Sequence, residues 1–300
     1  MTVFRTEPKL LLMLKNQAKQ VMKKQEAISS NSLSALVIFI AILVIIYSGS
    51  VLPLFTFATG EPQTNNNYYY HMAVSTQKDP LPVILIHGYD EDSSVWSEWQ
   101  SLLQKDGIQF YVVTFNQSDD RCGSSANHAK ELEQIVKNVE ATTGQNQVNM
   151  VAHSKGGLDA RVFLSNSSIT DVANLIMIGT PNGGGPLASP FDPCSPAVYD
   201  FIDNAPATMA PRNLHTQYHT IAGIWNPSLP QNCPQPGWQQ FEVNGYFTLS
   251  SLGYQLNDGF VPVSSVQSQP YFHSLGNTTD CHRNLFTNQE YVLAAPIMRG

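Results

Sequence analysis

Basic side chains are scarce in most of this 300-residue chain. From residue 33 onward, ten Lys and Arg residues stand against 21 Asp and Glu residues, so this part carries a formal charge of −11. Nucleic-acid binding depends on neutralising phosphates with Lys and Arg. The charge of the main body therefore argues against a nucleic-acid partner.

Charged residues are absent altogether from Ser32 to Phe55 (SLSALVIFIAILVIIYSGSVLPLF). A charge-free apolar stretch of helix length is close to what a bilayer core requires, so we expect a transmembrane anchor at residues 33–55. Residues 1–32 form a basic arm with a net charge of +4. Because basic residues flanking a span favour the cytoplasmic side, we expect this arm in the cytoplasm and the main body outside. The alternative is a cleaved signal peptide, which would leave the body secreted.

Cysteine is absent from the first 121 residues. The four cysteines, Cys122, Cys194, Cys233 and Cys281, all follow the predicted anchor. An oxidising compartment would let them pair as two disulfides, with three possible connectivities.

The chain after the anchor begins with a polar linker at residues 56–79, which lacks any periodicity. The folded domain is expected at 80–300, where apolar runs typical of buried strands alternate with amphipathic segments. Strands are expected at 81–87, 110–115, 148–152, 175–180 and 218–224, and helices at 93–105, 124–142 and 157–164. Strands that are apolar throughout and interleaved with helices indicate an α/β fold, a mostly parallel central sheet with helices on both faces.

Regular alternation stops after Thr180, and eleven of the nineteen prolines lie between Pro181 and Pro236. A long irregular insertion in a compact domain is commonly a covering flap. We therefore expect a Pro/Gly-rich, lid-like insertion at about 182–253.

Ser154 lies between the predicted strand VNMVA and a predicted helix, in the sequence Ala-His-Ser-Lys-Gly-Gly. A sharp strand-to-helix bend exposes a serine hydroxyl but brings positions −2 and +2 together, so the small residues Ala152 and Gly156 have the required size. These features favour a nucleophile at Ser154 over a simple serine helix cap.

His87-Gly88-Tyr89 ends the first predicted strand of the domain. Gly88 allows close approach of the backbone, so the N–H groups of Tyr89 and Lys155 can form an oxyanion hole. His87 is expected to support the loop by hydrogen bonding, and the Lys155 side chain is expected to point to solvent.

A serine nucleophile needs a histidine base, and that base needs an acid. Of the eight histidines, His282 alone has a loop position late in the chain, and Asp258 lies at a tight Asn-Asp-Gly turn 24 residues before it. Asp280 is the rival acid, although two residues from His282 it would have to fold back on its own base.

The domain from Pro80 to Met298 resembles lipases of the α/β-hydrolase superfamily, particularly the secreted bacterial triacylglycerol lipases. The similarity rests on His-Gly-Tyr after a strand, on AHSKGG, on GTPNGGG at 179–185, on NDGFVPVSS and on the late histidine. It implies Ser154 as nucleophile, His282 as base, Asp258 as acid and an oxyanion hole at Tyr89 and Lys155. Many such lipases bind calcium through an aspartate two residues after the histidine, but this chain has Asn284, so we expect no metal.

The sequence therefore predicts hydrolysis of carboxylic esters, with lipid-like substrates favoured, and no cofactor. A thioesterase or an acyltransferase would use the same triad. A membrane-anchored, hydrolase-like binding domain without turnover is the alternative from a different class.

Overall fold

The computed structural model describes residues 79–188, 194–229, 232–233 and 239–300. The predicted basic arm, the predicted anchor and all but the last residue of the predicted linker lie outside these residues. Within the described part, no helix has both the length and the apolar character needed to cross a bilayer.

The centre of the domain is a six-stranded sheet in which every neighbouring pair of strands is parallel. The strand order is β2-β1-β3-β4-β5-β6, with the two earliest strands at one edge. The strands are β1 (Val83–Ile86), β2 (Phe110–Val112), β3 (Val148–His153), β4 (Val172–Ile178), β5 (Gln217–Gly223) and β6 (His273–Thr278). The α/β prediction is thus confirmed.

Helices and short helical turns connect the strands. The longer helices are α3 (Ser97–Lys105), α4 (Ser125–Thr143), α5 (Lys155–Leu164), α7 (Gln239–Ser251) and α9 (Asn288–Arg299). The short ones are η1 (Ser93–Trp96), α6 (Ser195–Val198), η2 (Tyr199–Phe201), α8 (Val263–Val266) and η4 (His282–Asn284).

Local chemistry sets the ends of α4. The Ser124 hydroxyl accepts a hydrogen bond from the Asn127 N–H, and the helix ends at Gly144 in the left-handed conformation that glycine adopts without strain. The sequence would suggest Ser93 or Ser94 as the cap of the 93–105 segment, but the Asp92 side chain caps η1 instead, by accepting a hydrogen bond from the Ser94 N–H.

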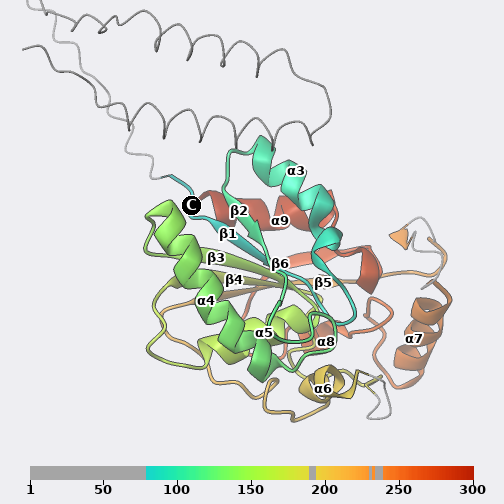
Figure 1. The fold of residues 1–300 in the computed structure, drawn as a ribbon. Helices are drawn as coiled ribbons and strands as arrows, with labels where there is room; N and C mark the ends of the chain where they lie inside the picture. Colours follow the sequence, from blue (N-terminus) through green and yellow to red (C-terminus); the bar gives the residue numbers. More distant parts are fainter. Residues whose placement is uncertain (1–78, 189–193, 230–231, 234–238) are drawn as a thin grey trace, which may run out of the picture. The chain divides into compact units, whose positions relative to one another are not determined.

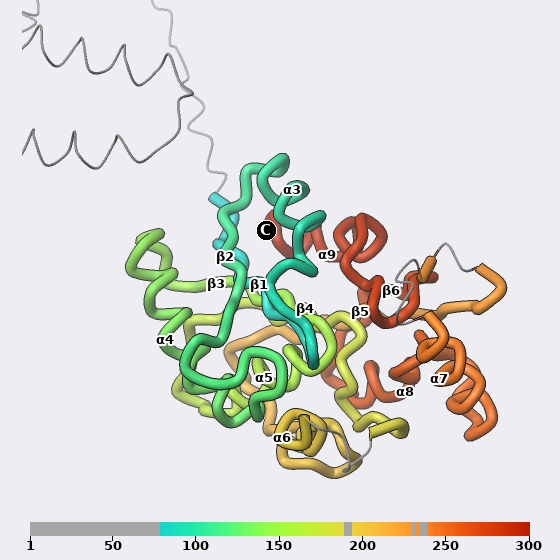
Figure 2. The backbone as a smooth tube through the Cα atoms, turned by 45° about the vertical axis from the view of Figure 1, so that its right-hand side comes forward, coloured from blue at the N-terminus to red at the C-terminus, as the bar shows by residue number. Residues whose placement is uncertain are grey.

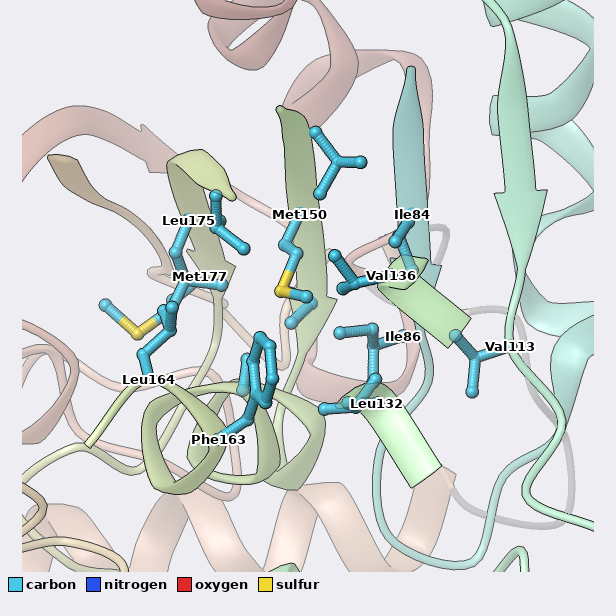
Figure 3. Close-up of a cluster of buried hydrophobic side chains, with 14 of the residues drawn as sticks. Ile84, Ile86, Val113, Leu132, Val136, Met150, Phe163, Leu164, Leu175 and Met177 are labelled. Atoms are coloured by element: carbon cyan, nitrogen blue, oxygen red, sulfur yellow. The ribbon is translucent and has the colours of Figure 1, made fainter. Parts of the chain in front are cut away.

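Helices cover both faces of the sheet, with α4 and α5 on one face and α3 and α9 on the other (Figure 1). The rotated view shows the same two pairs on opposite sides (Figure 2). Strand β1 shows why both faces are apolar: Ile84 and Ile86 pack toward α4 and α5, whereas Val83 and Leu85 pack toward α3 and α9. Figure 3 shows the first of these layers, with the β1 isoleucines beside Leu132 of α4.

Trp96 and Trp99 belong to the second layer and are fully buried. Their rings pack edge to face at 5.4 Å, and Trp99 also contacts Tyr291 of α9 at 5.1 Å. The two tryptophans therefore pack α3 and the turn before it against α9.

The range predicted as one insertion contains β5, which hydrogen-bonds to both β4 and β6. The range therefore divides into two excursions, one between β4 and β5 and one after β5. The first carries α6 and η2, and the second carries α7.

Two disulfides join these excursions to the rest of the domain. Cys122 pairs with Cys194 across 72 residues, and Cys233 pairs with Cys281 across 48 residues. Of the three connectivities left open by the sequence, this is the one observed. The second bridge attaches the excursion after β5 directly beside His282.

Candidate active site

Ser154 lies at the bend between β3 and α5. Its backbone has a φ of 50° and a ψ of −127°, a left-handed conformation that is strained for any residue with a side chain. The bend leaves no room at its flanks. A Cβ atom on Gly156 would collide with the carbonyl oxygen of His87, and Ala152 is completely buried. The structure therefore shows the crowded turn that the small residues predicted.

Three side chains from distant parts of the chain form a continuous line of hydrogen bonds. The Ser154 Oγ lies 2.8 Å from the His282 Nε2, and the His282 Nδ1 lies 2.8 Å from the Asp258 Oδ2. A carboxylate at Nδ1 requires a hydrogen on that nitrogen, which leaves Nε2 as the acceptor for the serine hydroxyl. The arrangement can therefore take a proton from Ser154.

Asp258 is held as a fixed acceptor. It is completely buried, and its Oδ1 accepts hydrogen bonds from the backbone N–H groups of Phe260 at 2.9 Å and Val261 at 2.6 Å. The His282 N–H in turn donates to the Asp258 carbonyl oxygen at 2.9 Å. These bonds leave the Oδ2 aimed at the imidazole. The rival residue, Asp280, instead accepts from the Thr287 hydroxyl at 2.9 Å.

The loop after β1 packs against Ser154. A Cβ on Gly88 would lie 2.8 Å from the Ser154 Cβ, so glycine is what lets the backbone leading to Tyr89 pass beside the serine. His87 stabilises this loop as expected. Its Nε2 lies 3.0 Å from the Asp120 Oδ1, and its Nδ1 lies 3.1 Å from the Gly88 carbonyl oxygen.

Sequence reasoning missed the Glu91–His153 pair behind the site. The His153 Nδ1 lies 2.9 Å from the Glu91 Oε2, and its Nε2 lies 3.0 Å from the His282 carbonyl oxygen. Glu91 also accepts the Gly88 N–H at 2.8 Å. Although burial opposes ionisation, the adjacent His153 lowers the pKa of Glu91 to about 2. One carboxylate thus holds both the loop beside Ser154 and, through His153, the backbone of His282.

The only sequence signal for this pair was its position. Glu91 follows Gly88 by three residues, and His153 directly precedes Ser154. Neither spacing distinguishes a supporting residue from an exposed one.

The expectation for the Lys155 side chain is wrong, because it is only 1% exposed. Its Nζ lies 2.6 Å from the Asp159 Oδ1 and 3.6 Å from the Asp200 Oδ2. The second oxygen of Asp159 lies 2.7 Å from the His128 Nδ1. Burial opposes ionisation of Asp159, but Lys155 and His128 lower its pKa to about 2. A buried ammonium needs such partners, and they lie on α4, α5 and η2, which the sequence pattern did not bring together.

Aromatic side chains form a wall beside the imidazole. The Phe260 ring stacks on His282 with centroids 5.1 Å apart, and Phe201 lies 6.4 Å from Phe260. Tyr89 lies 5.7 Å from Phe201. The wall therefore runs from the His282 ring to the loop after β1.

No group of three or more His, Cys, Asp or Glu side chains in the described part of the chain is arranged to hold a metal ion.

The sequence pattern of the palmitoyl protein thioesterase family matches residues 82–227. A triacylglycerol lipase of Pseudarthrobacter phenanthrenivorans is 37% identical over 115 residues, which cover 36% of this chain and 35% of the lipase. The matched region thus spans about a third of the length of the curated lipases that the chain resembles.

Solved structures show the same fold. A mature Bacillus licheniformis lipase has a TM-score of 0.58 at 20% identity, and the match covers 73% of this chain and 92% of the lipase. A metagenomic carboxyl esterase has a TM-score of 0.51 at 16% identity, and the match covers 86% of this chain and 87% of the esterase. The domain therefore has the α/β-hydrolase fold. Together with the sequence match, this confirms the predicted resemblance to the lipases and esterases of that superfamily.

Proposed function

We propose that the domain is a serine hydrolase that cleaves carboxylic esters through an acyl-enzyme. The observation that carries this proposal is the line of hydrogen bonds from Ser154 through His282 to Asp258. In this mechanism His282 takes the Ser154 proton as the oxygen attacks the ester carbonyl, and Asp258 stabilises the resulting imidazolium. His282 then protonates the departing alcohol, and water releases the acyl group by the same route.

The N–H groups of Tyr89 and Lys155 are the proposed oxyanion hole. Support comes from the contact of Gly88 with Ser154 and from the position of Lys155 as the first residue of α5. A helix N-terminus carries a partial positive charge that favours a developing oxyanion. The buried Lys155 ion pair with Asp159 would hold this first turn in place.

Lipid-like acyl groups are the proposed substrates. The aromatic wall of Tyr89, Phe201 and Phe260 offers an apolar surface beside His282. Phe241 of α7 lies 5.9 Å from Phe260, which supports the idea that the excursion after β5 covers the site as a lid. The charge-free segment at 33–55 and the two disulfides support an anchored domain outside the cytoplasm.

A thioesterase is the second candidate, and one observation favours it. The palmitoyl protein thioesterase pattern matches 82–227, a region that includes Ser154 and the loop after β1. Thioesters and oxygen esters pass through the same type of tetrahedral intermediate, so the triad serves both. Rates on matched palmitoyl oxygen esters and thioesters would separate the two candidates.

The Ser154→Ala variant tests the nucleophile. We expect kcat on a suitable ester to fall by about 10³- to 10⁶-fold, as removal of triad members does elsewhere, with little change in thermal stability. Wild-type protein should form a covalent adduct with a fluorophosphonate, located at Ser154 by mass spectrometry. A variant with near wild-type turnover, or a wild-type protein that forms no adduct, would contradict the proposal and favour the binding domain without turnover.

A further inference from the structure

A second carboxyl group is buried beside the proposed triad. Glu242 of α7 is only 1% exposed, although glutamate is almost never fully buried without a partner. Its Oε1 accepts a hydrogen bond from the Arg283 N–H at 3.3 Å. Its Oε2 is also buried and has no hydrogen-bond partner within the described residues. Burying a carboxyl oxygen without a hydrogen-bond partner costs free energy of folding. A role in function would explain why the carboxyl is kept there.

Helix α7 places this carboxyl against the residues that directly follow Asp258 and His282. Gly259 directly follows Asp258, and a Cβ on Gly259 would lie 2.6 Å from the Glu242 Oε2 and 2.9 Å from the Glu242 carbonyl oxygen. Gly259 has a φ of +96°, so glycine also avoids strain there. Arg283 directly follows His282. The Glu242 carboxyl thus touches the residue after Asp258 and the residue after His282.

The charges around Glu242 come from three residues. Burial raises the pKa of Glu242 to about 7. The His282 and Arg283 charges oppose this rise, whereas the negative charge of Asp258 adds to it. The effect between Glu242 and His282 is reciprocal, because two interacting sites titrate as a pair. An ionised Glu242 therefore attracts a positive charge on the His282 ring.

Other titratable groups also lie beside the His282 ring. Asp258 binds its Nδ1, and the His153 ring lies 4.8 Å away, between the Glu91 carboxylate and the His282 carbonyl oxygen. Acceptor oxygens therefore face both ring nitrogens of His153. A negative charge on Glu242 attracts the positive charge that the His282 ring gains when it takes the Ser154 proton.

We propose that Glu242 is a positioning residue for the base, acting through His282 to stabilise the imidazolium that forms when Ser154 gives up its proton. This inference rests on the proposed function. Glu242 exchanges no proton in the step: the Ser154 proton goes to His282, and the serine oxygen forms the new bond to the acyl carbon. The contribution of α7 is the carboxyl group that it holds at this point, which carries a negative charge wherever it is ionised.

The Glu242→Gln variant of the full-length chain tests the inference. Glutamine has nearly the same shape and keeps an oxygen for the Arg283 N–H, but it cannot ionise. The readout is the second-order rate of fluorophosphonate reaction at Ser154 from pH 5 to 9.5, together with kcat and KM on an ester. The acid limb of the pH–rate profile is the range in which the rate rises with pH. We expect this limb to move to lower pH by about 0.5 to 1 unit in the variant. We also expect the rate at pH 9 to fall about 3- to 10-fold, with KM unchanged.

Glu290→Gln is the matched control. Glu290 lies at the start of α9, is fully buried, and has a pKa that burial raises to about 7 in the same way. It contacts Thr287 and not the triad. Its replacement should leave the acid limb where the wild type has it.

The outcomes are distinguishable. The acid limbs of the wild type and of Glu242→Gln could superimpose, or the ratio of their rates could be constant across pH. Either result would show a structural role for Glu242 and would overturn this inference alone. A wild type that forms no Ser154 adduct at any pH would overturn the proposed function first. If Glu242→Gln does not fold, Glu242→Asp and a neutral variant that folds, such as Glu242→Met, provide the test. Glu242→Asp keeps the charge on a shorter side chain. It should therefore shift the acid limb less than the neutral variant does.

Discussion

The buried ammonium of Lys155 shows how much a single residue can depend on its surroundings. Lys155 and Lys137 both form ion pairs with an acidic residue four positions away along a helix. The Lys137 side chain is 56% exposed, and the Lys155 side chain is 1% exposed. Exposed pairs contribute little to stability, whereas removal of one partner from a buried pair leaves an uncompensated charge.

We therefore expect Lys155→Met to lower the free energy of unfolding by about 3 to 5 kcal/mol, because Asp159 loses its closest cation. Lys137→Met should change it by less than about 1 kcal/mol. Urea denaturation of both variants measures the difference. Similar small losses in the two variants would mean that the Lys155 ion pair contributes little.

Gly156 illustrates a constraint at the level of an element. The turn from β3 to α5 requires the backbone of this glycine to lie against the strand end at His87, and an added Cβ would meet two backbone oxygens, those of Ile86 and His87. The same turn sets the φ of 50° at Ser154. Backbone atoms cannot rotate away as a flexible side chain can, so the bend itself must change.

Gly156→Ala should therefore lower kcat by at least about 100-fold, because a displacement near 1 Å at the reacting group has that effect. Gly107→Ala is the control. Its glycine has a φ of +70° but nothing within 4 Å of an added Cβ, so it should cost about 1 kcal/mol of stability and leave kcat unchanged. Full activity in Gly156→Ala would show that the turn tolerates the displacement.

The stability of the whole molecule should depend on pH through its buried carboxyl groups. Burial raises the pKa of Glu290 to about 7, whereas in the unfolded chain it titrates near 4.5. The folded state therefore binds more protons than the unfolded state between these values, and the contribution of Glu290 to stability decreases as pH rises through that range.

Glu290→Gln removes the pH-dependent loss of stability, because glutamine does not ionise. It keeps an acceptor for the backbone N–H of Thr287, the residue that caps α9. Relative to the wild type, the variant should gain about 1 to 3 kcal/mol of unfolding free energy between pH 4.5 and pH 7.5. Thermal or urea unfolding at both pH values measures this. A stability difference that does not vary with pH would mean that Glu290 ionises normally in the fold.

The sequence by itself determined the alternation of strands and helices, the two small residues around Ser154 and the choice of Asp258 and His282. These features follow from local physics: apolar periodicity, turn chemistry and the chemical needs of a serine nucleophile. The bounds of β1, β3 and α4 agree with the expected ranges to within two residues. The position of the last strand, β6 at His273–Thr278, depends instead on pairing with β5.

Only the tertiary structure decided which distant groups meet. It selected the disulfide pairing, buried Lys155 between Asp159 and Asp200, placed Glu91 behind His153 and brought Glu242 against Gly259 and Arg283. Each of these contacts joins elements that are separated in the sequence or turns a side chain inward, and a periodic pattern carries no information on either. Burial then sets the charge state of each group, because the cost of removing a charge from water depends on all of its neighbours at once.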